Sequence, residues 1–165
     1  MTKLSADNIN PVRNFALPYA SHGISNGVNR VFDANINRAK EGLRVCEEVT
    51  RFLLNNRALT AELKSCRHSI DAILKKIPQA LKFLKMRDSG HDIGKNIYIN
   101  ELKRGNIQDI FFANMQRVKE SIRVLEEFSK LENINCAIRF KRLRYRIYEI
   151  EKKSAGRVSA LSNTR

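Results

Sequence analysis

One segment of this chain occurs twice, and the repeat limits the folds that the chain can adopt. Residues 32–48, FDANINRAKEGLRVCEE, return at 111–127 as FFANMQRVKESIRVLEE, at a constant offset of 79. Ten of the seventeen positions are identical, and most of the others exchange similar residues. Two copies of one sequence imply two copies of one structural unit. The repeated residues are mainly polar, and apolar packing alone does not require them, so the repeat is also the first functional lead.

The length and composition indicate a single domain. A chain of 165 residues can bury a core of its own. No apolar run approaches the ~20 residues of a membrane span, so no membrane partner is expected. Residues 1–10 lack the apolar stretch of a secretory signal. Cys46, Cys66 and Cys136 lack CxxC spacing, which argues against a zinc site or a disulfide framework, and each falls on an apolar helical face as a small hydrophobe. We therefore expect a protein of the reducing cytoplasm.

The apolar spacing predicts helices and no strands. Prolines, glycines, asparagines and serines predict a flexible N-terminal arm over residues 1–28, and small polar residues predict a disordered tail over 154–165. The helices are expected at about 31–54, 60–77, 107–131 and 135–153, with Thr60 as an N-cap, a short helical piece at 79–86 and a glycine-containing connection at 87–106.

The second helix of each pair repeats more weakly, at an offset of 77. Four residues match in this way: Lys64, Arg67, His68 and Ile70 correspond to Lys141, Arg144, Tyr145 and Ile147. The repeated unit is therefore a helical hairpin, at about 30–77 and 109–153. The sequence predicts a single all-α domain over 29–153, a four-helix-bundle-like arrangement with approximate internal twofold symmetry.

A helical wheel places several polar residues of the repeat on the apolar side. Asn35 lies at the centre of the apolar arc and Arg38 lies inside it, about 60° away. Glu41 and Glu48 lie at the edge of the arc, whereas Lys40, Arg44 and Glu47 point outward. The second copy repeats this map, with Asn114 central, Arg117 inside, and Glu120 and Glu127 at the edge.

Two interpretations of these polar residues stay open, and they are compatible. The first is a structural network in which Glu41 pairs with Arg38 on one helix. The second is a polar pocket between the hairpins, where Arg38 and Arg117 face a bound anion, because a guanidinium fork matches phosphate or carboxylate oxygens. Arg67 and Arg144 either add positive charge to such a pocket or extend along the surface. His68 and Tyr145 occupy equivalent positions, where a packing role is the simpler interpretation.

The connection RDSGHDIG at 87–94 also has two interpretations. Glycine permits close approach of the backbone to a phosphate, and an aspartate can hold a magnesium ion. The segment matches no standard phosphate-binding loop, so an ordinary surface connection is the alternative. The chain also lacks the signatures of P-loop, dinucleotide-binding and protein-kinase folds.

The two copies, together with CRHSI, RDSGHDIG and KRLRYRIYEIE, resemble a known family over about residues 30–152. The chain is similar to the helical domain often fused ahead of thiamine-phosphate synthase, which is regarded as a second, non-ribokinase type of hydroxymethylpyrimidine-phosphate kinase. The resemblance implies ATP-dependent phosphorylation of hydroxymethylpyrimidine phosphate to its diphosphate in thiamine biosynthesis. It implies ATP and Mg²⁺ as cofactors, the pyrimidine phosphate as the small-molecule partner, and thiamine-phosphate synthase as a candidate protein partner.

Phosphoryl transfer suggests a role for each candidate residue. Glu41, Glu120 and Asp88 are the candidate catalytic carboxylates, and Glu48, Glu127 and Asp92 are the candidate metal ligands. The candidates for binding substrate and phosphate are Asn35, Arg38, Asn114, Arg117, Arg67, Arg144, Arg87 and Tyr145. Two different substrates would require the two copies to specialise, and the mismatches Asp33/Phe112 and His68/Tyr145 are the first places to look.

The net charge of +14 supports an alternative function. Residues 139–153 carry seven Lys or Arg against two Glu, although no RNA-binding aromatic motif occurs. The alternative is a non-catalytic basic module that binds nucleic acid or a protein partner through this last helix. A third alternative is a domain that binds the pyrimidine phosphate without chemistry. The sequence leaves the oligomeric state open, a homodimer included.

Overall fold

The structure, a computed structural model, describes residues 22–78, 80–95 and 103–161, and these residues are all-α. Its four long helices are α1 (His22–Glu48), α2 (Arg57–Leu74), α5 (Ile107–Ser129) and α6 (Ile134–Leu161). The π-helical turn η1 (Val49–Leu53) continues α1, and the short helix α3 (Ala80–Lys85) follows α2. The described residues include no strand, so the predicted all-α fold is confirmed.

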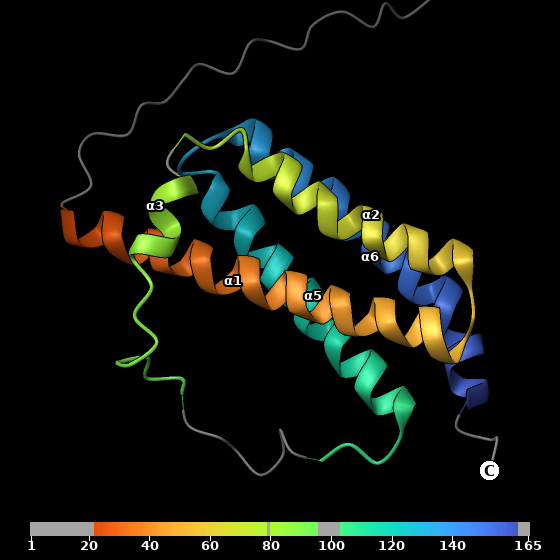
Figure 1. The fold of residues 1–165 in the computed structure, drawn as a ribbon. Coiled ribbons are helices and arrows are strands. Elements are labelled where there is room, and N and C mark those ends of the chain that lie inside the picture. Colours follow the sequence, from red (N-terminus) through yellow and green to blue (C-terminus); the bar gives the residue numbers. More distant parts are fainter. Residues whose placement is uncertain (1–21, 79, 96–102, 162–165) are drawn as a thin grey trace, which may run out of the picture.

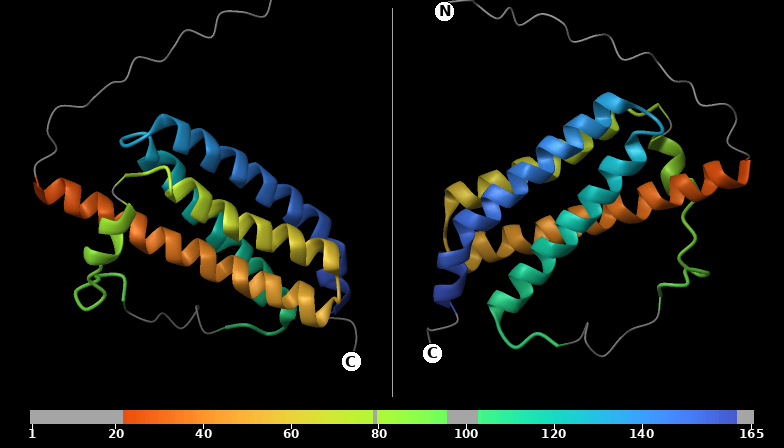
Figure 2. Two further views of the ribbon diagram at one scale, coloured as in Figure 1. Left: turned by 45° about the horizontal axis from the view of Figure 1, so that its top comes forward. Right: turned by 180° about the vertical axis from the view of Figure 1, so that it is seen from behind.

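The long helices form two hairpins that pack against each other (Figure 1). The helices α1 and α2 make one hairpin, and α5 and α6 make the other. Figure 2 shows α1 crossing α5 obliquely on one side of the bundle, while α2 and α6 run side by side on the other. Each long helix thus contacts its hairpin partner and one helix of the other hairpin. The internal twofold axis expected from the repeat stays a prediction, although individual contacts recur in both hairpins.

Several helix boundaries differ from the expected ones. Helix α1 begins at His22, inside the segment expected to be a flexible arm. Helix α6 continues to Leu161, so the expectation of a disordered tail from residue 154 is wrong. Ser154 and Val158 are buried and extend the core-facing side of α6 by two turns. The remaining parts of the expected arm and tail, residues 1–21 and 162–165, lie outside the described residues.

Asparagines make the turn within each hairpin. Asn55 ends the first helix with a φ of 48°, a left-handed conformation that asparagine tolerates better than most residues. Asn56 then caps α2, because its Oδ1 accepts a hydrogen bond of 3.0 Å from the amide of Leu59. The N-cap is therefore Asn56 and not Thr60. Asn133, at the offset of 77, accepts hydrogen bonds from the amides of Asn135 and Cys136 at the start of α6.

The core is a single apolar cluster drawn from both hairpins. Fully buried side chains come from every long helix, among them Leu43, Leu63, Ile70, Phe111, Met115, Ile122, Phe140 and Ile147. The three cysteines are also buried, which confirms their predicted role as small hydrophobes. Within the part of the chain that the structure describes, no helix is long and apolar enough to cross a membrane.

An aromatic stack fastens α3 to α1. The rings of Phe32 and Phe83 lie 4.8 Å apart and nearly parallel, and both side chains are buried. Such a pair contributes roughly 0.5–1.5 kcal/mol beyond the burial of its area. The stack holds the connection after α3 beside the first half of α1.

The buried side of α1 is rotated from the one predicted by the wheel. Phe32, which is fully buried, lies about 60° from Asn35 on the side away from Arg38. Asn35 is buried as predicted, but Arg38 is exposed and Glu47, expected to point outward, is only 3% exposed. The second copy shows the same rotation, with Arg117 exposed and Glu126 4% exposed. The wheel erred because the apolar residues of α1 contact two neighbours, α5 and α2, and the α2 side also buries polar groups.

Candidate active site

A cavity of about 530 Å³ opens between the first half of α1 and the connection that follows α3. Its lining is rich in charged and amide side chains: Arg30, Asp33, Asn35, Asn37, Arg38, Arg87, Asp88 and Asp92. Two elements supply these side chains, α1 and the connection after α3. The first half of α1 presents the first five, of which Asp33 and Asn35 are buried, and the stacked α3 directs residues 87–92 across them.

An ion pair closes one wall of this cavity. Arg87 donates from Nε to Asp33 Oδ2 at 2.7 Å and from an Nη atom to Asp33 Oδ1 at 2.8 Å. The hydrogen bonds to Asp33 raise the pKa of Arg87 above its ordinary value. Because the Asp33 side chain is only 12% exposed, this two-point contact anchors the connection to α1. The second terminal nitrogen of Arg87 makes no hydrogen bond to another described residue.

Two further arginines of α1 supply positive charge. Arg38 is exposed, and it makes no hydrogen bond or ion pair with another described residue. Arg30 donates a hydrogen bond of 3.4 Å to the carbonyl oxygen of Asp88. With Arg87, the cavity therefore holds three guanidinium groups against three aspartates, one of which is already paired. Such an arrangement suits a ligand that carries phosphate.

The connection contributes two carboxylates. Asp88 accepts from the backbone amide of His91 at 3.2 Å and contacts its ring Nδ1 at 2.9 Å. These hydrogen bonds hold the pKa of Asp88 below its ordinary value, so its carboxylate is ionised at neutral pH. Asp92 accepts from the amide of Gly94 at 2.9 Å through one oxygen. The other oxygen of Asp92 makes no hydrogen bond within the described residues.

Asn35 and Asn37 are held from their own helix. The side-chain Nδ2 of Asn35 donates to the carbonyl of Val31 at 2.9 Å, and that of Asn37 donates to the carbonyl of Asp33 at the same distance. Their amide nitrogens are thus occupied, and the carbonyl oxygen of Asn35 accepts no hydrogen bond from a described residue. An amide oxygen at the cavity wall can accept from an amino group of a ligand.

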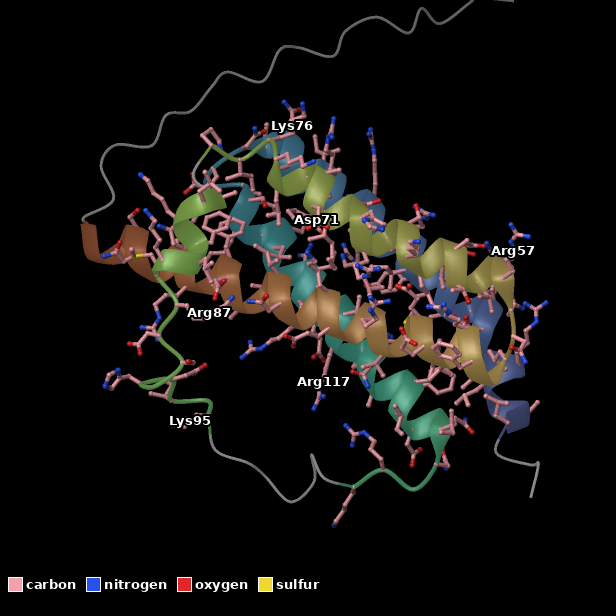
Figure 3. The ribbon with its side chains drawn as sticks, viewed as in Figure 1. Arg57, Asp71, Lys76, Arg87, Lys95 and Arg117 are labelled. Carbon is pink, nitrogen blue, oxygen red and sulfur yellow. The ribbon has the colours of Figure 1, made fainter. Side chains whose placement is uncertain are left out.

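One of the two interpretations of the sequence placed a polar pocket between the hairpins. The cavity instead lies between α1 and the connection after α3. The second-copy candidates Asn114, Arg117 and Glu120 lie on α5 and do not line it. Figure 3 shows Arg117 further along the bundle, apart from Arg87. Asn114 repeats the behaviour of Asn35, since its Nδ2 donates to the carbonyl of Ile110 at 2.8 Å. Glu120 accepts from Gln116, and Glu41 is exposed on α1 outside the lining.

Arg67 and Arg144 are occupied by buried carboxylates. Arg67 Nε donates to Glu47 at 3.2 Å, and Arg144 Nε donates to Glu126 at 2.8 Å, so the same pair occurs in both hairpins. The hydrogen bond that Arg144 donates to Glu126 raises the pKa of Arg144 above its ordinary value. These arginines join the two helices of each hairpin and do not reach the cavity.

The remaining candidates also lie elsewhere. Glu48 pairs with Arg44, and Glu127 pairs with Arg123 and Lys130, all on outer surfaces near the helix ends. Hydrogen bonding from Lys130 lowers the pKa of Glu127. Tyr145 is 56% exposed on α6 beside Arg144. The described residues contain no cluster of three or more His, Cys, Asp or Glu that could by itself hold a metal ion.

Arg30 and Asn37 are absent from the sequence prediction, and Asp33 was singled out there only as a mismatch between the two copies. Asp33 was visible as a departure from the repeat, because the second copy has Phe112 at that position. The structure places this difference at the cavity wall, where Asp33 holds Arg87. Arg30 precedes the repeat, and Asn37 corresponds to a different amide, Gln116, so neither stood out.

Comparison with known proteins identifies relatives of this chain. Residues 30–153 match the model of the ThiD2 family. A protein of Synechocystis named thiamine-phosphate synthase is 39% identical over 126 residues, which are 75% of this chain and 35% of the relative. The proteins of that name from Nostoc punctiforme and Rhodopirellula baltica are 38% and 34% identical over 78% and 80% of this chain, which cover 36% of each relative.

The chain thus spans only about a third of the length of these relatives. No solved structure matches it. The family match covers both copies of the repeat and the connection that lines the cavity, and the family's relatives are enzymes of thiamine biosynthesis by name. On this evidence the chain belongs to the ThiD2 family.

Proposed function

We propose that this chain is an ATP-dependent kinase that converts hydroxymethylpyrimidine phosphate to its diphosphate, with the cavity on α1 as its active site. The family membership supports a role in thiamine biosynthesis. The observation that carries the proposal is the meeting of Arg30, Arg38, Arg87, Asp88 and Asp92 in one cavity. Phosphoryl transfer requires mainly positioning and positive charge around the phosphates, and this lining supplies both.

The residues divide into three roles. Arg38 binds the phosphate of the pyrimidine substrate or of ATP, because no carboxylate of the described residues pairs with it. Arg87, already paired with Asp33, adds a hydrogen bond to the same phosphate through its remaining terminal nitrogen. Asn35 accepts a hydrogen bond from the pyrimidine amino group through its free oxygen. The acceptor in this reaction is an oxygen of the phosphate that the substrate already carries, which attacks the γ-phosphorus of ATP as ADP leaves. Asp88, ionised at neutral pH, accepts a hydrogen bond from the P–OH of that phosphate and orients it for attack.

The donor set fits a magnesium ion. Mg²⁺ is commonly held by one or two carboxylates together with substrate phosphates and water, so it does not require a closed cluster of protein ligands. Asp92 is the residue that would hold it, through the oxygen not bonded to Gly94. When bound, the ion neutralises part of the phosphate charge.

The direct test is turnover by the purified chain. ATP, Mg²⁺ and hydroxymethylpyrimidine phosphate should yield ADP and the pyrimidine diphosphate in equal amounts. Arg38→Ala should lower kcat/KM on the order of a hundredfold, the effect of losing one charged contact to phosphate. Arg117→Ala is the matched control, since it removes the same residue from the second copy, outside the cavity, and should leave turnover unchanged.

The outcomes separate the reaction from the site. If the folded wild-type chain shows a thermal shift with the pyrimidine phosphate but no turnover, the domain binds its ligand without chemistry and the kinase proposal fails. If turnover occurs but Arg117→Ala loses as much activity as Arg38→Ala, the reaction stands and the cavity on α1 is not the whole site.

A further inference from the structure

A basic groove runs between α2 and α6, away from the cavity on α1. A hollow of about 290 Å³ is lined by Arg139, Arg142 and Arg146 of α6 and by residues of α2, including Ser69, Ala72 and Ile73. A second hollow of about 470 Å³ shares Arg139 and Arg142 and adds Lys76 from the end of α2. Figure 3 shows Lys76 and Arg87 on opposite sides of the bundle. The groove is therefore separate from the proposed active site.

The positive charges of this groove are not neutralised. Arg139, Arg142 and Lys76 have no carboxylate within ion-pair distance among the residues that the structure describes, and Arg146 donates only to the Ser65 hydroxyl, at 3.1 Å. Other cations of the bundle behave differently, since Lys119 pairs with Glu151 and Lys153 pairs with Glu62. Three arginines without a carboxylate partner thus lie along one part of the surface of α6 and line the same groove.

The spacing of these arginines suits a linear ligand. With a rise of 1.5 Å per residue, Arg139 and Arg142 lie about 4.5 Å apart along the axis of α6, and Arg142 and Arg146 lie about 6 Å apart. A single phosphate would engage one or two of them and leave the rest unpaired. A strand with regularly spaced phosphates can engage all three at once, and a guanidinium fork suits each phosphate.

The described lining of the groove offers positive charge to phosphates but no aromatic ring on which a base could stack. Ala72, Ile73 and Leu143 form its apolar part, and its described lining contains neither an aromatic ring nor a carboxylate. A base stacks on aromatic side chains in most single-strand sites, so base recognition is not provided for here. A flexible strand can adjust the positions of its phosphates to the unequal spacing of the three arginines, which favours it over a rigid duplex.

We propose that the groove between α2 and α6 binds single-stranded nucleic acid through its phosphates, with little preference for sequence. This binding is independent of the proposed kinase activity, because no groove residue lines the cavity on α1. The net charge of +14 strengthens the long-range attraction for such a strand.

Fluorescence anisotropy with a labelled strand of about 20 nucleotides tests the proposal, since one small domain covers roughly 4–16 nucleotides. The triple variant Arg139→Ala/Arg142→Ala/Arg146→Ala should bind at least about tenfold more weakly at about 0.15 M salt. Its plot of log K against log salt should be shallower by about 2, from 0.7 for each of three lost phosphate contacts.

The matched control is Arg51→Ala/Arg57→Ala/Arg157→Ala. It removes three exposed arginines elsewhere, so both variants carry the same net charge, 14 − 3 = +11. Figure 3 shows Arg57 at the other end of α2 from Lys76. The control should keep wild-type affinity, and circular dichroism should show that both variants are folded.

Four results would overturn the proposal. The first is that the wild type fails to bind the strand. The second is that both triple variants weaken binding equally, which would show that net charge alone determines the affinity. A duplex of the same length binds as tightly, which would exclude a preference for single strands. ATP, inorganic triphosphate or polyglutamate competes as well as the unlabelled strand does, which would assign the groove to a small anion or an acidic protein.

Discussion

At the scale of single residues, the repeated Glu-Glu pair separates two kinds of carboxylate. Glu47 and Glu126 have side chains only 4% and 5% exposed. Each accepts hydrogen bonds from two arginines, one on its own helix and one on the other helix of its hairpin. Their neighbours Glu48 and Glu127 are 40% exposed and pair on the surface. A buried charge without its partner costs far more than an exposed one, so the first carboxylate of each pair is structural.

This difference predicts unequal costs of substitution. Glu47→Ala should lower the free energy of unfolding by about 3–5 kcal/mol, because it leaves the largely buried Arg67 without its partner. Glu48→Ala, the matched control one residue later, should cost less than about 1 kcal/mol. Urea unfolding followed by circular dichroism at neutral pH measures both. Equal losses would show that the Glu47–Arg67 pair is no more important than a surface ion pair.

At the scale of elements, a glycine sets how closely α1 approaches α5. A Cβ atom at Gly42 would lie 2.7 Å from Val118 Cγ2 and 3.0 Å from the carbonyl oxygen of Asn114. Gly42 belongs to the first copy of the repeat, and Val118 and Asn114 belong to the second. The two copies therefore touch where α1 crosses α5. The second copy has a buried serine, Ser121, at the position that corresponds to Gly42. The closest approach is therefore made from one copy only.

Gly42→Ala should destabilise the protein by about 1–3 kcal/mol, because the backbone of α5 cannot give way cheaply. Gly156→Ala is the control, since α6 has open space at that position. That substitution should be neutral or stabilise by roughly 0.5–1 kcal/mol, the difference in helix propensity. Thermal unfolding of both variants and the wild type measures these changes in stability. A Gly42→Ala protein as stable as the wild type would contradict the close crossing.

At the scale of the whole molecule, the buried cysteines tie stability to pH. Burial raises the pKa of the Cys66 thiol from about 9 to about 11, with smaller opposing effects of Arg146 and Glu62. Burial also raises the pKa values of Cys46 and Cys136. The folded protein therefore keeps a proton on Cys66 between about pH 9 and 11, whereas the unfolded chain releases it. The contribution of Cys66 to stability is complete below pH 9 and is lost as the pH rises toward 11.

Between pH 9 and 11, Cys66 should make the free energy of unfolding fall by about 1.4 kcal/mol per pH unit. Cys66→Ala lacks this dependence but leaves a small cavity, so it should be about 1 kcal/mol less stable at pH 7. Its disadvantage should shrink and then reverse as the pH rises. Denaturation of both proteins across this range tests the prediction, and because their lysines are the same, parallel curves would contradict it.

The repeat and the apolar spacing were enough to predict the helices, because both signals are local. A period of 3.6 residues marks a helix wherever it lies, and two copies of a hairpin imply two similar packing units. The residue types of the connection also made Arg87, Asp88 and Asp92 candidates for phosphate chemistry, with an ordinary surface connection as the alternative, and the structure places all three at the cavity. Their role stays a prediction. The family match extends over the same residues.

Only the tertiary structure decided which polar residues are buried and which meet in a cavity. On α1, the wheel gave Arg38 and Glu47 the opposite environments from those observed, because burial depends on which sides α2 and α5 cover. Arg87 reaches Asp33 across 54 positions of the sequence only because Phe83 stacks on Phe32 and turns the connection back over α1. Contacts at such separation are set by packing between elements, and the periodicity within one element carries no information about them.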